Sequence, residues 1–503
     1  MKKLSIIICL LALFVLCLPV HATTPTHRLA VRPSISGPEL YDTATGYSVV
    51  LRGNTYIHRD GAGKVIGFLD SDYGHAATAT VLDTMQAYGY NTVRVIVYAN
   101  DSVTETGINQ EYLDNVVDFL TLADARGLHV WLVVAGQPTH GVYWPAETSA
   151  DFEMPNQKYL DPALFPLRMA YITDMVNAIV GAGAPVAGVI WQVANEIYFD
   201  TNKKPFTLTG TVEALDGQSY DMLNSASRLA MMDSNQAVWI NAARAAVRSV
   251  LPDALVTANV FGPTIPPIYG KPANYISRPL ALTASEIDLL DIHIYPGTVA
   301  SVDAELAAYG TIDKPTVLGE FGAYPFLYPT IQAGIDAAKG LQVKTCGRSF
   351  RGWLYYDYDD MTYAIWHATD SNNAMLDALS LRARPDPCAL AKPATLSGIV
   401  GVSSTGVVTA YVTDPDNPNP PVLNAWENGV FRGTFSAMFE RPDLAQLYPW
   451  TVGRMVGRQW RPALSLLTDG QTHVVCVYFR DYNDYTLTTY TDPLIGCVTL
   501  PKL

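Results

Sequence analysis

Short apolar runs alternate with longer stretches of helical periodicity between residues 48 and 382 of this 503-residue chain. Apolar runs of about four to eight residues are typical of buried strands. Strands that alternate with helices predict a parallel sheet with helical crossovers. The expected strands are 48–53, 92–97, 130–135, 188–193, 255–260, 289–294, 316–319 and 352–356.

The stretches between and after these strands carry the apolar spacing of helices packed on a sheet. The clearest are 76–88, 110–125, 167–180, 234–250, 302–308, 331–340 and 374–382. Eight strand and helix units over about 340 residues predict a (β/α)8 TIM barrel with long loops, of fold class α/β. A doubly wound sheet is the alternative fold.

The pattern of apolar and polar residues changes after the proline-rich segment 384–393, where strand alternation and turns replace helical periodicity. Residues 474–479 have strand character, and Asn428-Gly429 predicts a hairpin turn that joins 422–426 to 430–433. No helix is expected in this region, and a small β-sandwich of about 110 residues fits it.

The amino terminus has the pattern of a signal peptide. Two lysines follow Met1, residues 4–20 are almost wholly apolar, and Val20-His21-Ala22 resembles a cleavage site. We expect a mature chain that starts near Thr23 and is secreted or periplasmic, with an uncleaved anchor as the alternative. The expected division is a signal peptide at 1–22, a barrel domain at 23–390 and a β-sandwich domain at 391–503.

The charge excludes some partners. The chain has 33 basic and 47 acidic side chains, and the signal peptide removes two lysines, so the mature net charge is 31 − 47 = −16. Nucleic acid is not expected as a partner, since phosphate binding needs a basic face. An acidic surface suits uncharged ligands such as neutral sugars, although it also serves solubility alone.

Four of the six cysteines remain after Cys9 and Cys17 leave with the signal peptide. An even number in an exported chain favours disulfides, and we expect Cys346–Cys388 and Cys476–Cys497. Neither group has the Cys-x-x-Cys spacing of a zinc site, and no histidine is adjacent to a cysteine.

Two glutamates end the fourth and seventh expected strands, Glu196 after Gln192-Val193-Ala194-Asn195 and Glu320 after Val317-Leu318-Gly319. Barrel enzymes carry their reactive groups at the carboxyl ends of the strands, so both side chains should meet at one rim. Two facing carboxyl groups are what glycoside hydrolysis requires. The structural alternative for either residue is a helix cap or a surface ion pair.

These residues resemble clan-A glycoside hydrolases, and in particular family five, the cellulase and mannanase family. The matching positions, within residues 48–360, are Arg52-Gly53-Asn54, Arg94, Asn195-Glu196, His293-Ile294-Tyr295, Glu320 and Trp353. One position departs from the family: the third strand ends in Val133-Val134-Ala135-Gly136-Gln137 without the usual histidine, and His140 follows three residues later. A neighbouring clan-A family therefore stays open.

The resemblance implies an exported retaining β-glycosidase that acts on a β-glycan or oligosaccharide, with Glu196 as general acid/base and Glu320 as nucleophile. It implies that Asn195 binds the sugar 2-hydroxyl, that Arg94 holds Glu320 ionised, and that Tyr295 donates to the nucleophile. His293 would line the site, and Trp353 would form an apolar floor under the sugar. The alternatives are a structural ion pair within the barrel for Arg94, a core histidine with satisfied hydrogen bonds for His293, and ordinary core packing for Trp353.

Other chemistries lack their motifs. Gly61-Ala62-Gly63-Lys64 continues with Val65, where a phosphate loop needs Ser or Thr, and no His-Glu-x-x-His or Gly-x-Ser-x-Gly occurs. No cofactor and no metal are expected. The functional alternatives are an exo-glycosidase on short glycosides and a non-catalytic carbohydrate-binding barrel.

Two further features concern sugar binding. The long segments after the third, fourth and fifth strands carry Tyr143, Trp144, Tyr198, Phe199, Tyr269 and Tyr275, which either stack on sugars or pack the loops onto the barrel. The region after residue 390 resembles a small β domain appended to exported bacterial proteins. A carbohydrate-binding role and a stabilising role are both open for it.

Overall fold

The computed structural model describes residues 27–34, 37–57, 67–69, 73–145, 149–264, 274–299, 301–346, 350–359, 365–381, 383–384, 396–413, 421–439, 441, 444, 456–482, 490–491 and 493–503. The expected signal peptide at 1–22 lies outside these residues. Cys388, and with it the expected bridge to Cys346, also lies outside them.

Eight parallel strands form the central sheet, in the order β13-β9-β8-β5-β4-β17-β16-β15. They are β4 (Leu51–Thr55), β5 (Thr92–Ile96), β8 (His129–Val133), β9 (Val189–Gln192), β13 (Leu255–Thr257), β15 (Leu290–His293), β16 (Thr316–Phe321) and β17 (Phe350–Tyr355). Each strand lies beside its neighbour along the chain, and the first pairs with the last. Asp288 N donates to Val256 O at 2.9 Å where β13 and β15 meet. The expected (β/α)8 barrel is confirmed, rather than a doubly wound sheet.

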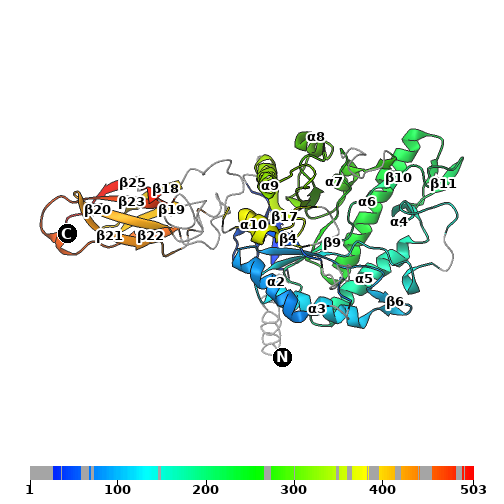
Figure 1. Cartoon of the computed structure of the whole chain (residues 1–503), viewed down its shortest axis with the longest axis horizontal. Coiled ribbons are helices and arrows are strands. Elements are labelled where there is room, and N and C mark those ends of the chain that lie inside the picture. Colours follow the sequence, from blue (N-terminus) through cyan, green and yellow to red (C-terminus); the bar gives the residue numbers. More distant parts are fainter. Residues whose placement is uncertain are drawn as a thin grey trace, which may run out of the picture.

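Helices surround the strands (Figure 1). They are α2 (His75–Ala87), α3 (Gln110–Asp124), α4 (Gln157–Leu160), α5 (Phe165–Gly181), α6 (Ser225–Val250), α7 (Pro279–Ala284), α8 (Val302–Ala307), α9 (Ile331–Cys346) and α10 (Asp370–Leu379). The helix α6 starts at Ser225, earlier than expected, because the Asn224 side chain accepts the N–H groups of Ala226 and Ser227.

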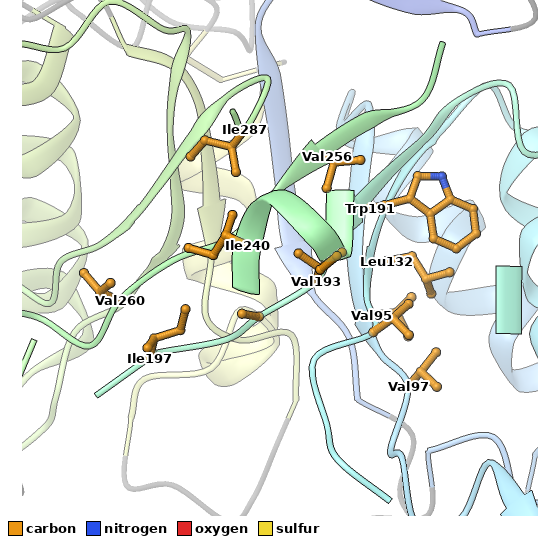
Figure 2. Packing of buried hydrophobic residues seen from close by; sticks show 14 of the residues in the cluster. Val95, Val97, Leu132, Trp191, Val193, Ile197, Ile240, Val256, Val260 and Ile287 are labelled. Atoms are coloured by element: carbon orange, nitrogen blue, oxygen red, sulfur yellow. The ribbon is translucent and has the colours of Figure 1, made fainter. Parts of the chain in front are cut away.

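Two apolar layers hold the barrel together. The outward side chains of the strands, such as Val95, Leu132, Trp191 and Val256, pack toward the helices, among them Ile240 of α6 (Figure 2). The inward side chains form a second cluster, which includes Leu51, Trp131, Val133, Ile190, Leu255, Val317 and Leu354. Leu29 of β1 (Leu29–Arg32) and Leu40 of β2 (Glu39–Asp42) belong to it, so this hairpin, with β3 (Ser48–Val49), covers one end of the barrel.

The C-terminal region is a β-sandwich with its own core. One antiparallel sheet has β18 (Leu396–Val402), β19 (Val408–Thr413) and β22 (Gly457–Trp460), and the other has β20 (Val422–Glu427), β21 (Val430–Ser436), β23 (Val474–Tyr482), β24 (Tyr490–Thr491) and β25 (Leu494–Thr499). Val408 and Val412 of the first sheet pack with Leu423 and Phe479 of the second. Contrary to expectation, the described part of this region includes a helical turn, α12 (Ser465–Thr468).

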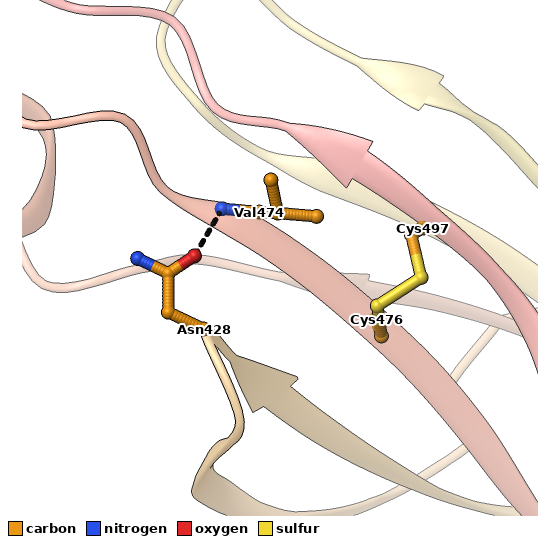
Figure 3. The surroundings of a disulfide bond; sticks show 4 residues. All are labelled: Asn428, Val474, Cys476 and Cys497. Atoms are coloured by element: carbon orange, nitrogen blue, oxygen red, sulfur yellow. Dashed lines mark hydrogen bonds between the residues drawn. A yellow bond between two sulfur atoms is a disulfide. The ribbon is translucent and has the colours of Figure 1, made fainter.

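The hairpin and one disulfide of this region are confirmed. Asn428 and Gly429 have φ values of 45° and 80°, the left-handed conformation that a tight hairpin turn needs. The Asn428 side chain also accepts from Val474 N at 3.0 Å (Figure 3). Cys476 of β23 and Cys497 of β25 lie opposite each other and form a disulfide. None of the described helices is long and apolar enough to cross a membrane.

Candidate active site

Glu320 reaches the mouth of the barrel because β16 is irregular. Its register against β15 shifts at Ile292/His293, and its register against β17 shifts between Leu318 and Phe321. Bulges of this kind re-aim side chains. Here the shift brings Glu320 opposite His293, and the Glu320 side chain is buried.

Gly319 makes room for a buried carboxylate below the site. A Cβ atom at Gly319 would lie 1.9 Å from Oδ1 of Asp291, so any side chain there would collide with that carboxylate. Asp291 is fully buried, and neither of its oxygens has a hydrogen-bond partner among the described residues. His293 Nε2 lies 3.6 Å from Asp291 Oδ2.

Glu196 occupies the opposite side of the mouth in an unusual backbone conformation. Its φ is 52°, in the left-handed region that residues other than Gly and Asn rarely adopt. The Asn259 side chain, two residues beyond β13, accepts the Glu196 N–H at 2.5 Å and fixes this turn. The Glu196 side chain keeps 29% of its surface exposed.

One imidazole joins the two glutamates. His293 Nδ1 donates to Glu196 Oε1 at 3.0 Å and lies 3.4 Å from Glu320 Oε2. One carboxylate oxygen of Glu196, one of Glu320 and a ring nitrogen of His293 all lie within 4.8 Å of one another. The two carboxyl groups and the imidazole therefore form one cluster.

Glu320 has two further partners. Arg94 of β5, whose side chain is fully buried, places Nη1 2.6 Å from Glu320 Oε1. Tyr295 donates its hydroxyl to Glu320 Oε2 at 2.8 Å. Both oxygens of Glu320 therefore have a partner, Arg94 at Oε1 and Tyr295 at Oε2.

These contacts set the charge of the site. Burial alone would raise the pKa of Glu320, but His293, Arg94 and the Tyr295 hydroxyl together lower it below 4.5. Burial alone would lower the pKa of His293, but Glu320, Asp291 and Glu196 raise it to about 10. The site therefore favours an ionised Glu320.

A polar network orients the residues between β5 and β9. Gln192 Oε1 accepts from Arg94 Nε and Nη2, each at 3.2 Å, and from Trp131 Nε1 at 2.8 Å. Asn195 Oδ1 accepts from Arg94 Nη2 at 2.9 Å and from Gln192 Nε2 at 3.0 Å. The Asn195 side-chain oxygen is thus held, and its amide nitrogen is the group available to a ligand.

The structure brings six of the seven expected site residues together: Glu196, Glu320, Arg94, Asn195, His293 and Tyr295. Trp353 is the exception, because Leu354 of β17 faces the barrel interior and its neighbour therefore faces outward. The Trp353 indole donates to Thr345 Oγ1 of α9 at 2.9 Å, so Trp353 packs between strand and helix. Two other aromatic rings lie beside Tyr295: that of Tyr324, at 5.4 Å between ring centroids, and that of Tyr356, at 6.4 Å.

Arg52 also points away from the site. Its guanidinium donates to the carbonyl oxygens of Leu379, the last residue of α10, and of Arg384. A cation at the carboxyl end of a helix stabilises the helix dipole. His140 lies apart from both glutamates, where its Nε2 is 3.1 Å from Asn100 O.

The loop aromatics divide into two groups. Tyr143 is buried and donates to Asp174 of α5, and Phe199 is buried against Tyr159, so both pack the loops onto the barrel. Tyr198 and Tyr275 are half-buried and stack on each other, with ring centroids 4.1 Å apart. Tyr269 lies outside the described residues.

Three polar residues of the site were not expected from the sequence: Gln192, Asn259 and Asp291. Each is fully buried within or just beyond a strand that reads as apolar. The available signal was a polar side chain inside such a run, because a buried polar group requires partners and so indicates a built network.

We expect Gly319→Ala to destabilise the barrel by about 1–3 kcal/mol, because the added methyl group must displace the Asp291 carboxylate. Urea unfolding followed by fluorescence measures this change. The matched control is Gly340→Ala in α9, where a Cβ meets nothing within 4 Å and should instead stabilise the helix slightly. Equal stabilities of the two variants would contradict the proposed collision.

The charge of Arg94 should determine the acid limit of activity. Since Arg94 lowers the Glu320 pKa, Arg94→Gln should raise that pKa. As the pH falls, Glu320 would then be protonated earlier, and the acid limb of kcat/KM on an aryl glycoside should move to higher pH. Arg244→Gln, which alters an ion pair of α6 with Asp288, is the control and should leave the profile in place. An unmoved acid limb in Arg94→Gln would show that Arg94 does not hold Glu320 ionised.

Comparisons with known proteins are limited to the fold. No protein-family model matches the chain, and no curated protein matches it. Among solved structures, an endo-β-1,4-mannanase from Thermotoga petrophila is 13% identical with a TM-score of 0.47, and the match covers 89% of this chain and 97% of that one. An endo-1,4-β-mannanase from Rhizomucor miehei is 14% identical with a TM-score of 0.48, over 69% and 97%.

An exo-β-1,4-mannosidase from an Opitutaceae bacterium is 18% identical with a TM-score of 0.44. The match covers 70% of this chain, which spans only 59% of that protein. At these identities and TM-scores, the solved structures do not indicate the chemistry of the site, which follows only from the residues and distances of this chain.

Proposed function

We propose that this protein is a retaining glycoside hydrolase in which Glu320 is the nucleophile and Glu196 the general acid/base. The observation that carries the proposal is the spacing of the pair, with a carboxylate oxygen of each residue within 4.8 Å of the other. Retaining enzymes hold their carboxyl groups about 5–5.5 Å apart, whereas inverting enzymes need about 6.5–9.5 Å to admit a water molecule.

The two environments divide the roles. Glu320 is buried against Arg94 and Tyr295, which keeps it ionised and aimed for attack. Glu196 is partly exposed and accepts a hydrogen bond from His293, so its carboxyl group is accessible to substrate and water. An ionised nucleophile beside a carboxyl group that can hold a proton is the pairing that double displacement requires.

In the first step, a Glu320 oxygen bonds to the anomeric carbon, the glycosidic C–O bond breaks, and Glu196 gives its proton to the departing oxygen. In the second, Glu196 takes a proton from water, the water oxygen bonds to the anomeric carbon, and the Glu320 ester bond breaks. Asn195 is suited to donate its amide N–H to a sugar hydroxyl, since Arg94 and Gln192 hold its oxygen.

The test is hydrolysis of a panel of aryl β-glycosides and β-linked polysaccharides, with the anomeric configuration of the first product followed by NMR. Retention supports the proposal, and inversion contradicts the mechanism. Binding of polysaccharide without turnover of any substrate would favour the non-catalytic barrel. Release of single sugars only, from chain ends, would favour the exo-acting alternative.

We also propose that 23–390 is the catalytic domain, that 391–503 is an appended domain, and that 1–22 directs export and is then removed. The separate core of the C-terminal sandwich and the Cys476–Cys497 disulfide support this division and an oxidising compartment. A chain that ends at Leu390 should hydrolyse aryl glycosides at close to the intact rate. Loss of that activity in a truncated barrel of unchanged stability would show that the C-terminal domain contributes to the active site.

A further inference from the structure

One residue holds both sides of the segment that carries Glu196. Asn259, two residues beyond β13, donates its backbone N–H to Ala194 O at 3.3 Å, and its backbone oxygen accepts from Ile197 N at 3.1 Å. Between these two bonds, its side-chain oxygen accepts the Glu196 N–H. The main chain on each side of Glu196 and the N–H of Glu196 itself therefore all bind Asn259.

The nitrogen of the same side chain reaches a second partner of Glu196. Asn259 Nδ2 contacts His293 Nε2, and Nδ1 of the same imidazole donates to Glu196 Oε1 at 3.0 Å. Glu196, Asn259 and His293 thus form a closed ring of contacts, which runs from the Glu196 main chain to the Glu196 carboxyl group. The three residues lie at or just beyond the ends of β9, β13 and β15, which are neighbours in the barrel.

Packing does not account for an amide at this position. Asn259 is fully buried, and Ala258 and Val260 beside it are buried apolar residues of the barrel. A buried amide is costly unless both its oxygen and its nitrogen have partners. Here the near partners are the Glu196 N–H and the imidazole that binds Glu196, and Gln192 Nε2 adds a longer contact to the Asn259 oxygen, at 3.4 Å.

A general acid needs such a hold. The Glu196 side chain keeps 29% of its surface exposed, and a glutamate side chain can adopt several rotamers. Proton transfer requires that the carboxyl group lie within hydrogen-bond reach of the departing oxygen. A fixed main chain alone leaves the carboxyl group free to turn, whereas the closed ring of contacts fixes both the main chain and the carboxyl group.

We propose that Asn259 is a positioning residue for the general acid/base: its oxygen fixes the main chain of Glu196, and its nitrogen fixes, through His293, the direction of the Glu196 carboxyl group. The inference rests on the proposed function and deepens it. Glu320 has its own partners, Arg94 and Tyr295. Loss of the Asn259 side chain should therefore impair proton transfer and spare nucleophilic attack.

The test compares two leaving groups in Asn259→Ala. An oligosaccharide that the unsubstituted protein hydrolyses needs a proton on its departing oxygen, so a displaced general acid should lower kcat/KM on it by about 10²-fold. The nitrophenolate of a nitrophenyl glycoside of the same sugar departs without a proton. Formation of the glycosyl-enzyme, and with it kcat/KM on that substrate, should therefore be nearly unchanged. A purely structural role of Asn259 would lower both values together.

Further variants separate positioning from damage to the fold. Thr257→Val removes another buried hydrogen bond of β13, from Thr257 Oγ1 to Leu289 O at 2.8 Å, and should lower stability in urea without changing the ratio of the two kcat/KM values. Asn259→Ser cannot span both partners and should give the same ratio as Asn259→Ala, which covers a poorly folded alanine variant. Because Asn259 acts partly through His293, the losses of Asn259→Ala and His293→Ala on the oligosaccharide should be less than additive in the double variant.

Nitrogen-15 NMR of labelled histidines reads the contact without turnover. The ring signals of His293, identified by their loss in His293→Ala, should shift in Asn259→Ala because Nε2 loses its neighbour. The same signals should stay in place in Thr257→Val.

Four outcomes would overturn the inference: equal losses on the two substrates, no loss on either, strictly additive losses with His293→Ala, or His293 signals that do not move in Asn259→Ala. Failure of the proposed function looks different, since the unsubstituted protein would then hydrolyse no glycoside in the panel. Shifted His293 signals in such an inactive protein would support the ring of contacts and reject its role in proton transfer.

Discussion

Replacement of Glu320 by Gln should lower turnover on every glycoside substrate by several orders of magnitude while leaving the barrel folded. The amide keeps the shape of the side chain, and its oxygen can still accept from Tyr295. It cannot attack the anomeric carbon, and both steps of the double displacement pass through that bond. Arg94 loses its ion-pair partner but keeps Gln192 and Asn195, so the loss of stability should be small beside the loss of rate.

Steady-state kcat on an aryl glycoside and urea unfolding measure the two effects. Glu213→Gln, at an exposed glutamate of β11 (Thr211–Glu213), is the matched control and should retain full activity. Mass spectrometry of the unsubstituted enzyme with a slowly released 2-fluoro glycoside should find the sugar attached to Glu320. Attachment to another residue, or near-normal turnover of Glu320→Gln, would remove Glu320 from the nucleophile role.

Replacement of Glu196 by Ala should have an effect that depends on the leaving group. An unactivated sugar alcohol needs a proton to depart, so kcat/KM on oligosaccharides should fall by about 10²–10⁴-fold. A nitrophenolate departs without a proton, so formation of the glycosyl-enzyme should be largely spared on nitrophenyl glycosides. Hydrolysis of the glycosyl-enzyme then lacks a general base and should become rate-limiting, with a burst of nitrophenol release.

Added azide separates this explanation from general damage to the site. A small anion that needs no base should enter the space left by the Glu196 carboxyl group, restore turnover, and give a glycosyl azide of retained configuration. Equal losses on nitrophenyl glycosides and oligosaccharides, without azide rescue, would remove Glu196 from the acid role. Another residue would then have to supply the proton to the leaving group.

The strands of the barrel were predictable because each is a compact apolar run, and the helix positions followed from their periodicity. The residues at which the helices begin and end were less predictable. The helix α6 begins at Ser225 because Asn224 caps it, in a stretch whose apolar spacing is weak. The turn at Asn428-Gly429 was predictable because the required left-handed conformation restricts the residues that can occupy it.

The candidate site was predictable where a polar residue ends a strand, as with Glu196, Glu320 and Arg94. It was not predictable where the direction of a side chain depends on register. Trp353 lies near the end of its strand but faces α9, since one residue decides between interior and exterior. The roles of Asp291 and Gly319 depend on contact between two strands, and each strand alone gives no sign of it.

The backbone conformation at Glu196 also limits how this protein can be made more stable. Among the described residues, the other non-glycine positions with positive φ are Ser371, Asn372, Asn373 and Asn428, all with short polar side chains. A long side chain in this conformation costs about 1–2 kcal/mol. Selection for heat resistance alone would therefore favour Gly or Asn at position 196 and would remove the glutamate together with the strain. Under the proposed mechanism, stability and activity are opposed at this residue, and active thermostable variants have to gain their stability elsewhere in the chain.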